Sequence, residues 1–284
     1  MIEIRHKTSG EVLEQIPGST LAGADLRDMC LNEADLRGAD LSGANLELSD
    51  LVGADLHGAR LVGAVLTGAQ LNQADLSGAD LSQARFGSEL GARAAQLSGT
   101  NLTGANLTGA DLRNAEVRHA NLQGAELSHA DLRGTDFHGS DLSGVVARHA
   151  LFIRANLRET NLCGADLRDS HLNDANLALA SLHAADLSST QHHGFTVINL
   201  ANLEGADLRG ANLRQVMAQD VNLRNANLTD VDLTNAVLGG AILRRADVTN
   251  ANFAGVELAS VTMEFANFSK ARNAIIPAYK KNLR

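Results

Sequence analysis

A large apolar residue, most often leucine, recurs at every fifth position from Leu21 to Phe268, and a small residue stands two places before it. The stretch from Ala34 to Leu46, ADLRGADLSGANL, shows the repeat. Such an internal repeat constrains the fold more than any local preference. In an α-helix a five-residue spacing would turn successive leucines by about 140° and spread them around the cylinder. In a straight strand they would alternate between two faces.

A chain that turns a corner once in each pentapeptide satisfies the pattern. The large residue, at position i, and the small residue at i−2 then point to a common axis. Positions i+1 and i+2 accept Arg, Ser, Thr, His, Gln, Asp and Gly, as expected of corners that face solvent. Glycine dominates at i+2, where a corner can require a positive φ angle. The sequence therefore predicts a solenoid with a narrow core of alanine and leucine.

The unit Ala-(Asp/Asn)-Leu-x-x resembles that of the pentapeptide-repeat family over about residues 19–270. The resemblance implies an all-β fold, a right-handed quadrilateral β-helix with about 20 residues in each coil. At ~4.8 Å per coil, about 12 to 13 coils would make a rod roughly 60 Å long.

Both ends of the chain change character, as open solenoid ends that need caps should. Residues 1–18 are expected to form an N-terminal cap, with short strands at Ile2–Arg5 and Val12–Leu13. Residues 271–284 are expected to form a C-terminal cap. Its apolar residues, which can cover the last coil, are Ile275, Ile276 and Tyr279.

The five-residue spacing fails twice, in segments 87–96 and 188–197. Each time the flanking large residues are 11 apart where two repeats need 10, which predicts single-residue breaks. This count puts both breaks on one face, roughly 24 Å apart. Irregular segments on a rigid scaffold often carry binding residues, although drift in a decaying repeat explains them equally well. The candidate partner-binding residues here are Glu89, Arg93, His192 and His193.

The net charge of −9 hides an uneven distribution. Residues 8–86 hold 12 acidic residues against four arginines, a charge of −8. Residues 20 apart should stack on one face, and regular surface charge can imitate duplex DNA, which shows one phosphate per ~1.7 Å of axis. Alternatively, Asp at i−1 hydrogen-bonds the adjoining turn. The candidate partner-binding residues are Asp35, Asp55 and Asp75 on one face, with Asp40 and Asp80 on the neighbouring face.

No catalytic constellation is expected, because polar side chains should point outward from a filled rod. His129, His149 and Asp169 share an i+2 column in which a transition metal could bind. Scattered histidines at tolerant corners explain this column more simply. We therefore expect no enzyme, no metal site and no cofactor. The sequence also has no apolar run of about 18 residues and no secretion leader, so a cytoplasmic location is expected.

The family resemblance suggests two kinds of function. Some relatives bind DNA gyrase as duplex mimics and protect it from quinolone antibiotics or toxins, often as dimers joined at the C-terminal end. The acidic repeats fit this role. The very regular repeats here equally favour a general protein-interaction scaffold or adaptor, for example a secretion-associated one. Both are protein-binding functions, and the acidic surface argues against direct contact with nucleic acid.

Overall fold

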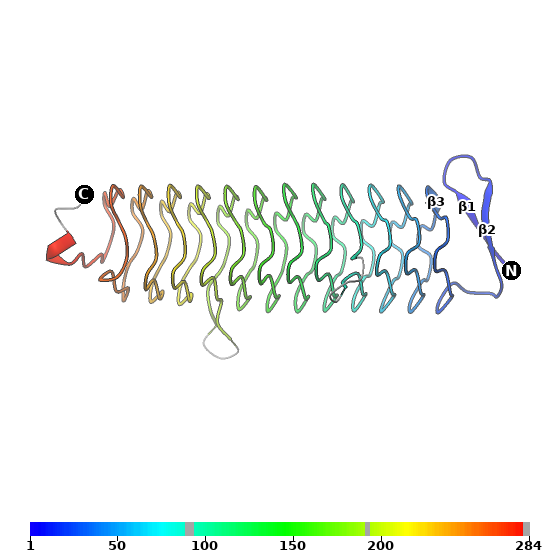
Figure 1. The fold of residues 1–284 in the computed structure, drawn as a ribbon, viewed down its shortest axis with the longest axis horizontal. Helices are drawn as coiled ribbons and strands as arrows, with labels where there is room; N and C mark the ends of the chain where they lie inside the picture. The colour runs from blue at the N-terminus through cyan, green and yellow to red at the C-terminus, as the bar shows by residue number, and fades with distance from the viewer. Residues whose placement is uncertain (89–93, 191–193, 281–284) are drawn as a thin grey trace. The chain divides into compact units, whose positions relative to one another are not determined.

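The computed structural model describes residues 1–88, 94–190 and 194–280. The chain divides into two compact units, Met1–Leu142 (unit 1) and Ser143–Arg284 (unit 2). In both units, parallel β-bridges join outward i−1 residues that are 20 positions apart, as in Asp35↔Asp55 and Asp166↔Asp186. Four pentapeptides fill each interval, so every coil has four sides, and the coils of each unit stack on one another (Figure 1).

The side chains at i and i−2 fill the interior of both units, as the repeat predicts. Leu122 in unit 1 and Leu182 in unit 2 are fully buried. Full burial of a leucine stabilises a fold by about 1.5–3 kcal/mol, so this column is the main source of stability. A hydroxyl at i−2 is also satisfied: Thr100 Oγ1 donates to the carbonyl of Leu97 at 2.7 Å. The fully buried phenylalanines are Phe86, Phe137, Phe152 and Phe253.

Most corners in the described residues are four-residue turns whose third residue has a positive φ angle. At the first corner the N–H of Ala24 donates to the carbonyl of Leu21 (3.0 Å), and Gly23 has a φ of +69°. Asparagine tolerates the same conformation, as Asn114 does with a φ of +59°. The Asn114 side chain then lies over the next coil, 2.4 Å from where a Cβ would stand on Gly134. A glycine such as Gly134 thus adopts the positive φ angle of the corner and also leaves room for the side chain of the neighbouring coil.

The N-terminal end is a hairpin of β1 (Ile2–His6) and β2 (Val12–Ile16). Strand β1 also pairs with β3 (Ala34–Asp35) of an early coil, so the hairpin joins the solenoid through its backbone (Figure 1). Both predicted strands are present and are slightly longer than expected. The hairpin is further held by Lys7, whose ammonium pairs with the Glu33 carboxylate at 2.8 Å.

The C-terminal end differs from the prediction. A single 3-10 turn, η1 (Ala278–Lys280), follows the last coil. Ile275 is 81% exposed, so the expectation that it covers this coil is wrong. Ile276 is half-buried, and Tyr279, although 67% exposed, donates from its hydroxyl to the carbonyl of Ala259 at 3.0 Å. The exposed carbonyls of the final coil need donors instead, because no further coil follows. The Lys280 ammonium supplies them, donating to the carbonyls of Leu258 (3.3 Å) and Val261 (2.6 Å).

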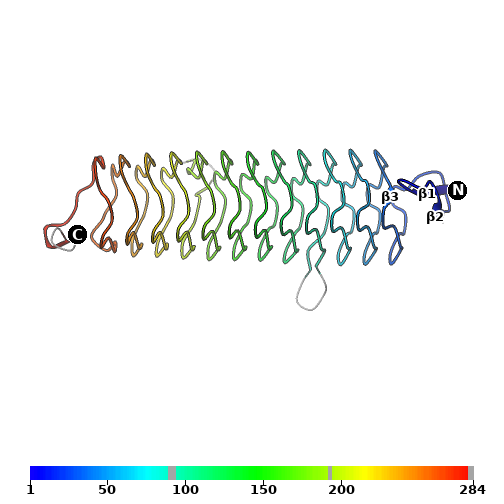
Figure 2. The ribbon, with the colours of Figure 1, turned by 90° about the horizontal axis from the view of Figure 1, so that it is seen from above.

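Each break in the repeat inserts six residues, not the single residue predicted. The ladder of unit 1 continues from Gln70 to Gln96, and that of unit 2 from His171 to Val197, a spacing of 26 instead of 20 in both. The chain therefore uses one repeat and six extra residues at each break. Figure 2 shows the coils of unit 1 continuing on both sides of the first break. The expectation that both breaks lie on one face depended on the shorter count and loses its basis.

Hydrogen bonds close the base of each insertion and keep the adjoining coils in register. In unit 1 the N–H of Ala95 donates to the carbonyl of Phe86 at 3.0 Å. In unit 2 the Asp169 carboxylate accepts hydrogen bonds from the N–H of Thr190 (2.8 Å) and from its hydroxyl. The N–H of Asp169 donates to the Thr196 hydroxyl at 2.8 Å. Asp169 is therefore an anchor of the second insertion.

Candidate protein-interaction surface

Asp35, Asp55 and Asp75 form a continuous acidic column on unit 1. They are the outward i−1 residues of three consecutive coils, joined by the parallel bridges Asp35↔Asp55 and Asp55↔Asp75. The structure thus brings together the three carboxylates that the 20-residue period predicts. The next bridge leads to Asn101 and the following one to Asn121, so the row of charges is interrupted after three coils, before Asp141.

Each carboxylate of the acidic column also supports its own corner. Oδ1 of Asp55 accepts a hydrogen bond from the N–H of His57 (3.1 Å), and Oδ1 of Asp75 accepts one from the N–H of Ser77 (3.0 Å). Asn101 makes the same bond, so the turn needs an oxygen and not a charge. The structural role considered for these residues is therefore real. It engages one oxygen and leaves the negative charge at the surface.

Arg37 neutralises part of the acidic column. Its guanidinium holds Asp35 through two bonds of 2.8 and 2.6 Å, and its Nε lies 3.6 Å from Oδ2 of Asp55. The hydrogen bond from Arg37 keeps the pKa of Asp35 below its ordinary value. Partial burial would raise the pKa of Asp75, but hydrogen bonds from Ser77 outweigh it and lower that pKa. Asp35 and Asp75 are therefore ionised at neutral pH.

The neighbouring face carries a weaker acidic pattern. Asp40 and Asp80 lie in one ladder, but Arg60 stands between them. Oδ1 of Asp40 accepts hydrogen bonds from the Ser42 hydroxyl (2.6 Å) and N–H (3.1 Å), which lower the pKa of Asp40. Two carboxylates around one guanidinium give this column little net charge, so Asp35, Asp55 and Asp75 remain the stronger candidates.

The other predicted candidates lie elsewhere. Glu89, Arg93, His192 and His193 fall outside the described residues, so their roles stay predictions. His129 belongs to unit 1, whereas His149 and Asp169 belong to unit 2. The Asp169 carboxylate is 6% exposed and is engaged by Thr190.

The described parts of the chain contain neither a metal-ion cluster nor a membrane-spanning helix. In residues 1–88, 94–190 and 194–280, no three His, Cys, Asp or Glu side chains are arranged to hold a metal ion. No helix in the same residues is long and apolar enough to span a membrane.

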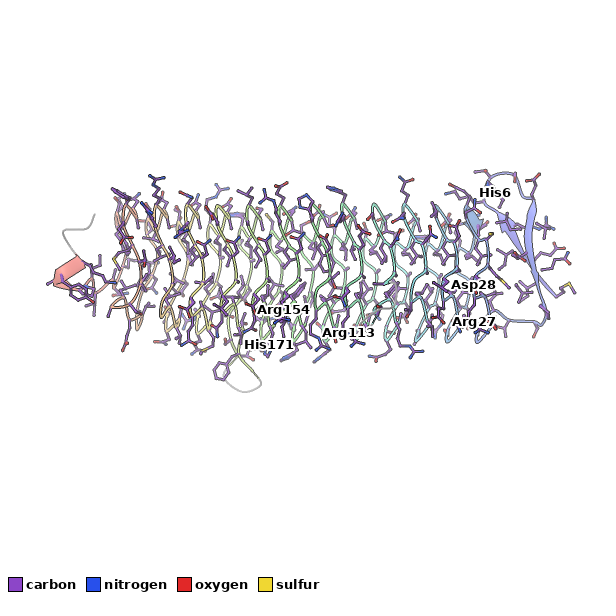
Figure 3. All side chains as sticks on the ribbon, in the orientation of Figure 1. His6, Arg27, Asp28, Arg113, Arg154 and His171 are labelled. Carbon is purple, nitrogen blue, oxygen red and sulfur yellow. The ribbon has the colours of Figure 1, made fainter. Side chains whose placement is uncertain are left out.

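Sequence reasoning missed a recurring clamp between Asp at i−1 and Arg at i+1. In each case the guanidinium binds both carboxylate oxygens of an outward i−1 aspartate; Figure 3 labels Arg27 and Arg113, which belong to two of these pairs. The hydrogen bond from Arg27 lowers the pKa of Asp25 to about 2. The signal is the tripeptide Asp-Leu-Arg. The clamped pairs are Asp25–Arg27, Asp35–Arg37, Asp111–Arg113, Asp131–Arg133, Asp166–Arg168 and Asp207–Arg209.

Even with these clamps the charge is unequal between the units. Residues 1–142 contain 20 acidic and 10 basic residues, a formal charge of −10. Residues 143–284 contain 13 acidic and 14 basic residues, a formal charge of +1. A basic partner would therefore be attracted to unit 1, where the acidic column lies.

Comparison with known families gives a match along most of the chain. The sequence pattern described as Pentapeptide repeats matches eight times, at residues 19–58, 49–87, 93–128, 116–146, 130–169, 150–188, 199–235 and 236–272. Together with the 20-residue parallel ladders, this match confirms the predicted all-β fold, a right-handed quadrilateral β-helix. A search of curated proteins returned no match.

Several solved structures are similar to this chain. HetL, a pentapeptide repeat protein involved in heterocyst differentiation regulation from the cyanobacterium Nostoc sp. strain PCC 7120, is 28% identical, with a TM-score of 0.46; the match covers 81% of this chain and 90% of HetL. QnrB1, a plasmid-mediated fluoroquinolone resistance protein, is 16% identical with a TM-score of 0.42, covering 65% and 89%. Rfr23 from the cyanobacterium Cyanothece 51142 is 27% identical with a TM-score of 0.15, covering 50% and 90%.

Proposed function

Because the chain belongs to the pentapeptide-repeat family, we propose that it is a non-enzymatic, cytoplasmic protein that binds another protein through the acidic column of unit 1. The observation that carries this proposal is the alignment of Asp35, Asp55 and Asp75 on successive coils. Their outward oxygens repeat at the coil spacing of ~4.8 Å. A regular row of carboxylates is complementary to a basic surface that binds a phosphate backbone.

The partner we propose is DNA gyrase, with the acidic column imitating duplex DNA and so protecting the enzyme from an antibiotic or a toxin. The number of charges limits how closely the acidic column alone can imitate duplex DNA. Two coil steps span about 10 Å, over which a duplex carries about six phosphate charges. The column carries three carboxylates, and Arg37 offsets one of them. The remaining acidic residues of unit 1 must therefore contribute to the mimicry.

A general interaction scaffold is the second candidate. It is favoured by the Arg37 clamp and by the replacement of Asp by Asn101 after three coils. Such a scaffold would use the rigid solenoid to present surfaces, with no role at a topoisomerase. In either case we also propose that two copies of the chain form a homodimer through their C-terminal ends. The exposed side chains of Ile275 and Tyr279 at this end support the proposal.

The test is a gyrase supercoiling assay, with and without a quinolone, against increasing amounts of protein. Wild type should inhibit or protect the enzyme. The triple variant Asp35→Asn, Asp55→Asn, Asp75→Asn should do so more weakly, because asparagine keeps the turn hydrogen bonds and removes three charges. A matched control is Asp166→Asn, Asp186→Asn, Asp232→Asn, which removes three charges from one ladder of unit 2.

Each result of this assay discriminates between the proposals. If wild type neither inhibits nor protects gyrase, the mimic proposal is wrong and the general scaffold replaces it. If wild type acts and both triple variants act equally well, gyrase is a partner but the acidic column is not the binding site. Equal melting temperatures of the three proteins would exclude unfolding as the cause of any loss.

A further inference from the structure

One face of unit 2 carries four apolar residues and one histidine at i−1, although the repeat does not require this. Its outward i−1 residues are Leu151, His171, Val197, Met217 and Val237, joined strand by strand in one parallel ladder. We call these five strands the apolar face. The other faces of unit 2 carry mainly Asn, Asp or Ser at i−1. The ladder on one of them, for example, is Asn156, Asn176, Asn202 and Asn222.

The apolar face lacks formal charge over its whole centre. The i+1 residues of its strands are also uncharged: Ile153, Asn173, Asn199, Gln219 and Gly239. Val237 is 38% exposed. At the adjoining corner Leu200 is 59% exposed and has a φ of +61°, an uncommon conformation for leucine. Solvent exposure of these side chains is unfavourable, so they indicate a surface that another molecule covers.

The charged residues along the i+2 edge of the apolar face are Arg154, Asp174 and Asp220. Figure 3 labels Arg154 and His171, which come from consecutive strands of this face. A centre that has no formal charge and is largely apolar at i−1, with charged residues at its rim, resembles the composition of a protein–protein interface. The rim is uneven, because its one cation stands at the first strand and its anions at the second and fourth.

As the alternative to a homodimer through the C-terminal end, we propose that the apolar face binds the same face of a second copy of this chain in an antiparallel arrangement. A two-fold axis makes an interface self-complementary. The two-fold axis runs parallel to the strands, midway between the strands of His171 and Val197. The strand of Leu151 in one copy then faces the strand of Met217 in the other. Leu151 of one copy then packs on Met217 of the other, and His171 packs on Val197.

The rim charges select this register. The same axis brings Arg154 of each copy opposite Asp220 of the other, because both residues occupy the i+2 edge. Two opposite-charge pairs therefore form, one on either side of the axis. An axis through the strand of Val197 would instead oppose Asp174 and Asp220, which repel each other.

The arginines of the opposite edge, where the second insertion joins the strand of Val197, do not disfavour this arrangement. Arg148 and Arg214 would face each other there, but each is already ion-paired within unit 2. Arg148 pairs with Asp166 at 2.7 Å, and Arg214 pairs with Asp232 at 3.1 Å. The size of the face sets the strength of the contact. Five strands at ~4.8 Å cover only about 20 Å, so the interface belongs to the small class that gives weak, reversible association.

Sedimentation velocity of the full chain over a range of micromolar concentrations tests the proposal. Wild type should show a reversible monomer–dimer equilibrium. Met217→Lys should weaken dimerisation about tenfold or more, because it places a charge in the centre of the interface. The matched control Ile242→Lys adds the same charge at an outward i−1 position of the next face and should leave the dissociation constant unchanged. Circular dichroism should show both variants folded.

A charge exchange tests the register. Arg154→Asp and Asp220→Arg should each weaken the dimer several-fold, because each turns two attractive pairs into repulsive ones. The double variant restores opposite charges and should recover wild-type dimerisation. If it does not, the antiparallel register is overturned. The apolar face itself is overturned if wild type stays monomeric, if Met217→Lys dimerises normally, or if Ile275→Lys at the C-terminal end abolishes the dimer instead.

Discussion

Glycine has two local roles in this chain, and only one of them is visible in the sequence. Gly104 is a corner glycine with a φ of +64° and no atom near its missing Cβ. The five-residue beat predicts it. Gly87 lies at the base of the first insertion, where a Cβ would stand 2.3 Å from Oδ1 of Asp111 and 2.6 Å from the backbone nitrogen of Arg113. It allows two coils to approach closely, which no spacing rule reveals.

Substitutions by alanine should separate these roles. Gly104→Ala should cost about 1 kcal/mol, because only the left-handed backbone conformation is strained. Gly87→Ala should cost about 2 to 3 kcal/mol, because its Cβ collides with the backbone of the next coil. Urea unfolding of both variants measures the difference. An equal loss in the two would show that the close approach at Gly87 relaxes without cost.

At the level of the coil, the sequence specifies what points inward. The core columns and the 20-residue coil were predictable because position i must be large and apolar and position i−2 must be small, and the chain repeats both requirements along its length. Leu122 and Gln123 illustrate the contrast, since the first is fully buried and the second is exposed.

The breaks were predicted wrongly because a spacing of 11 fits two descriptions. It can be two repeats and one extra residue, or one repeat and six. The ladder from Gln70 to Gln96 shows the second. The sequence contains a signal at the second break. An intervening repeat would place its large core residue five positions after Leu187 or five positions before Ile198, and these positions are His192 and His193. Histidine occupies no core position elsewhere in the repeat, so no intervening repeat should have been counted there.

A pair of aspartate substitutions tests the coil register. Leu122→Asp should destabilise unit 1 by about 3 to 5 kcal/mol, because it buries a carboxylate without a partner. Gln123→Asp introduces the same group at the adjoining corner and should change stability by less than about 0.5 kcal/mol. Thermal unfolding followed by circular dichroism measures both. Equal midpoints for the two variants would contradict the assignment of the inward positions.

For the molecule as a whole, the two candidate surfaces differ in how far they can be read from the sequence. The acidic column precedes the first break, so the period alone places Asp35, Asp55 and Asp75 together. The apolar face includes the second break. Val197 stacks on His171 only because the insertion is six residues long, and a single-residue insertion would put it in another column. The surface could therefore not be assembled without the ladder register.

The two surfaces also call for different physical forces, because unit 1 has a formal charge of −10 and unit 2 a charge of +1. If unit 1 imitates DNA, its binding to gyrase is mainly electrostatic. The Debye length falls from ~10 Å at 0.1 M salt to ~3 Å at 1 M, which is shorter than the roughly 10 Å of the acidic column. Added salt should therefore weaken the complex progressively.

Equilibrium binding of the chain to gyrase at several salt concentrations, with and without a short DNA duplex, measures this dependence. Wild type should lose affinity as salt rises and should be displaced by the duplex, because both compete for one basic surface. The triple Asn variant of the acidic column should show a shallower salt dependence, since three charges no longer take part. The triple Asn variant of unit 2 should keep the wild-type slope. A complex that withstands salt and is not displaced by DNA would contradict mimicry, because a partner bound at the DNA site through carboxylates must respond to both.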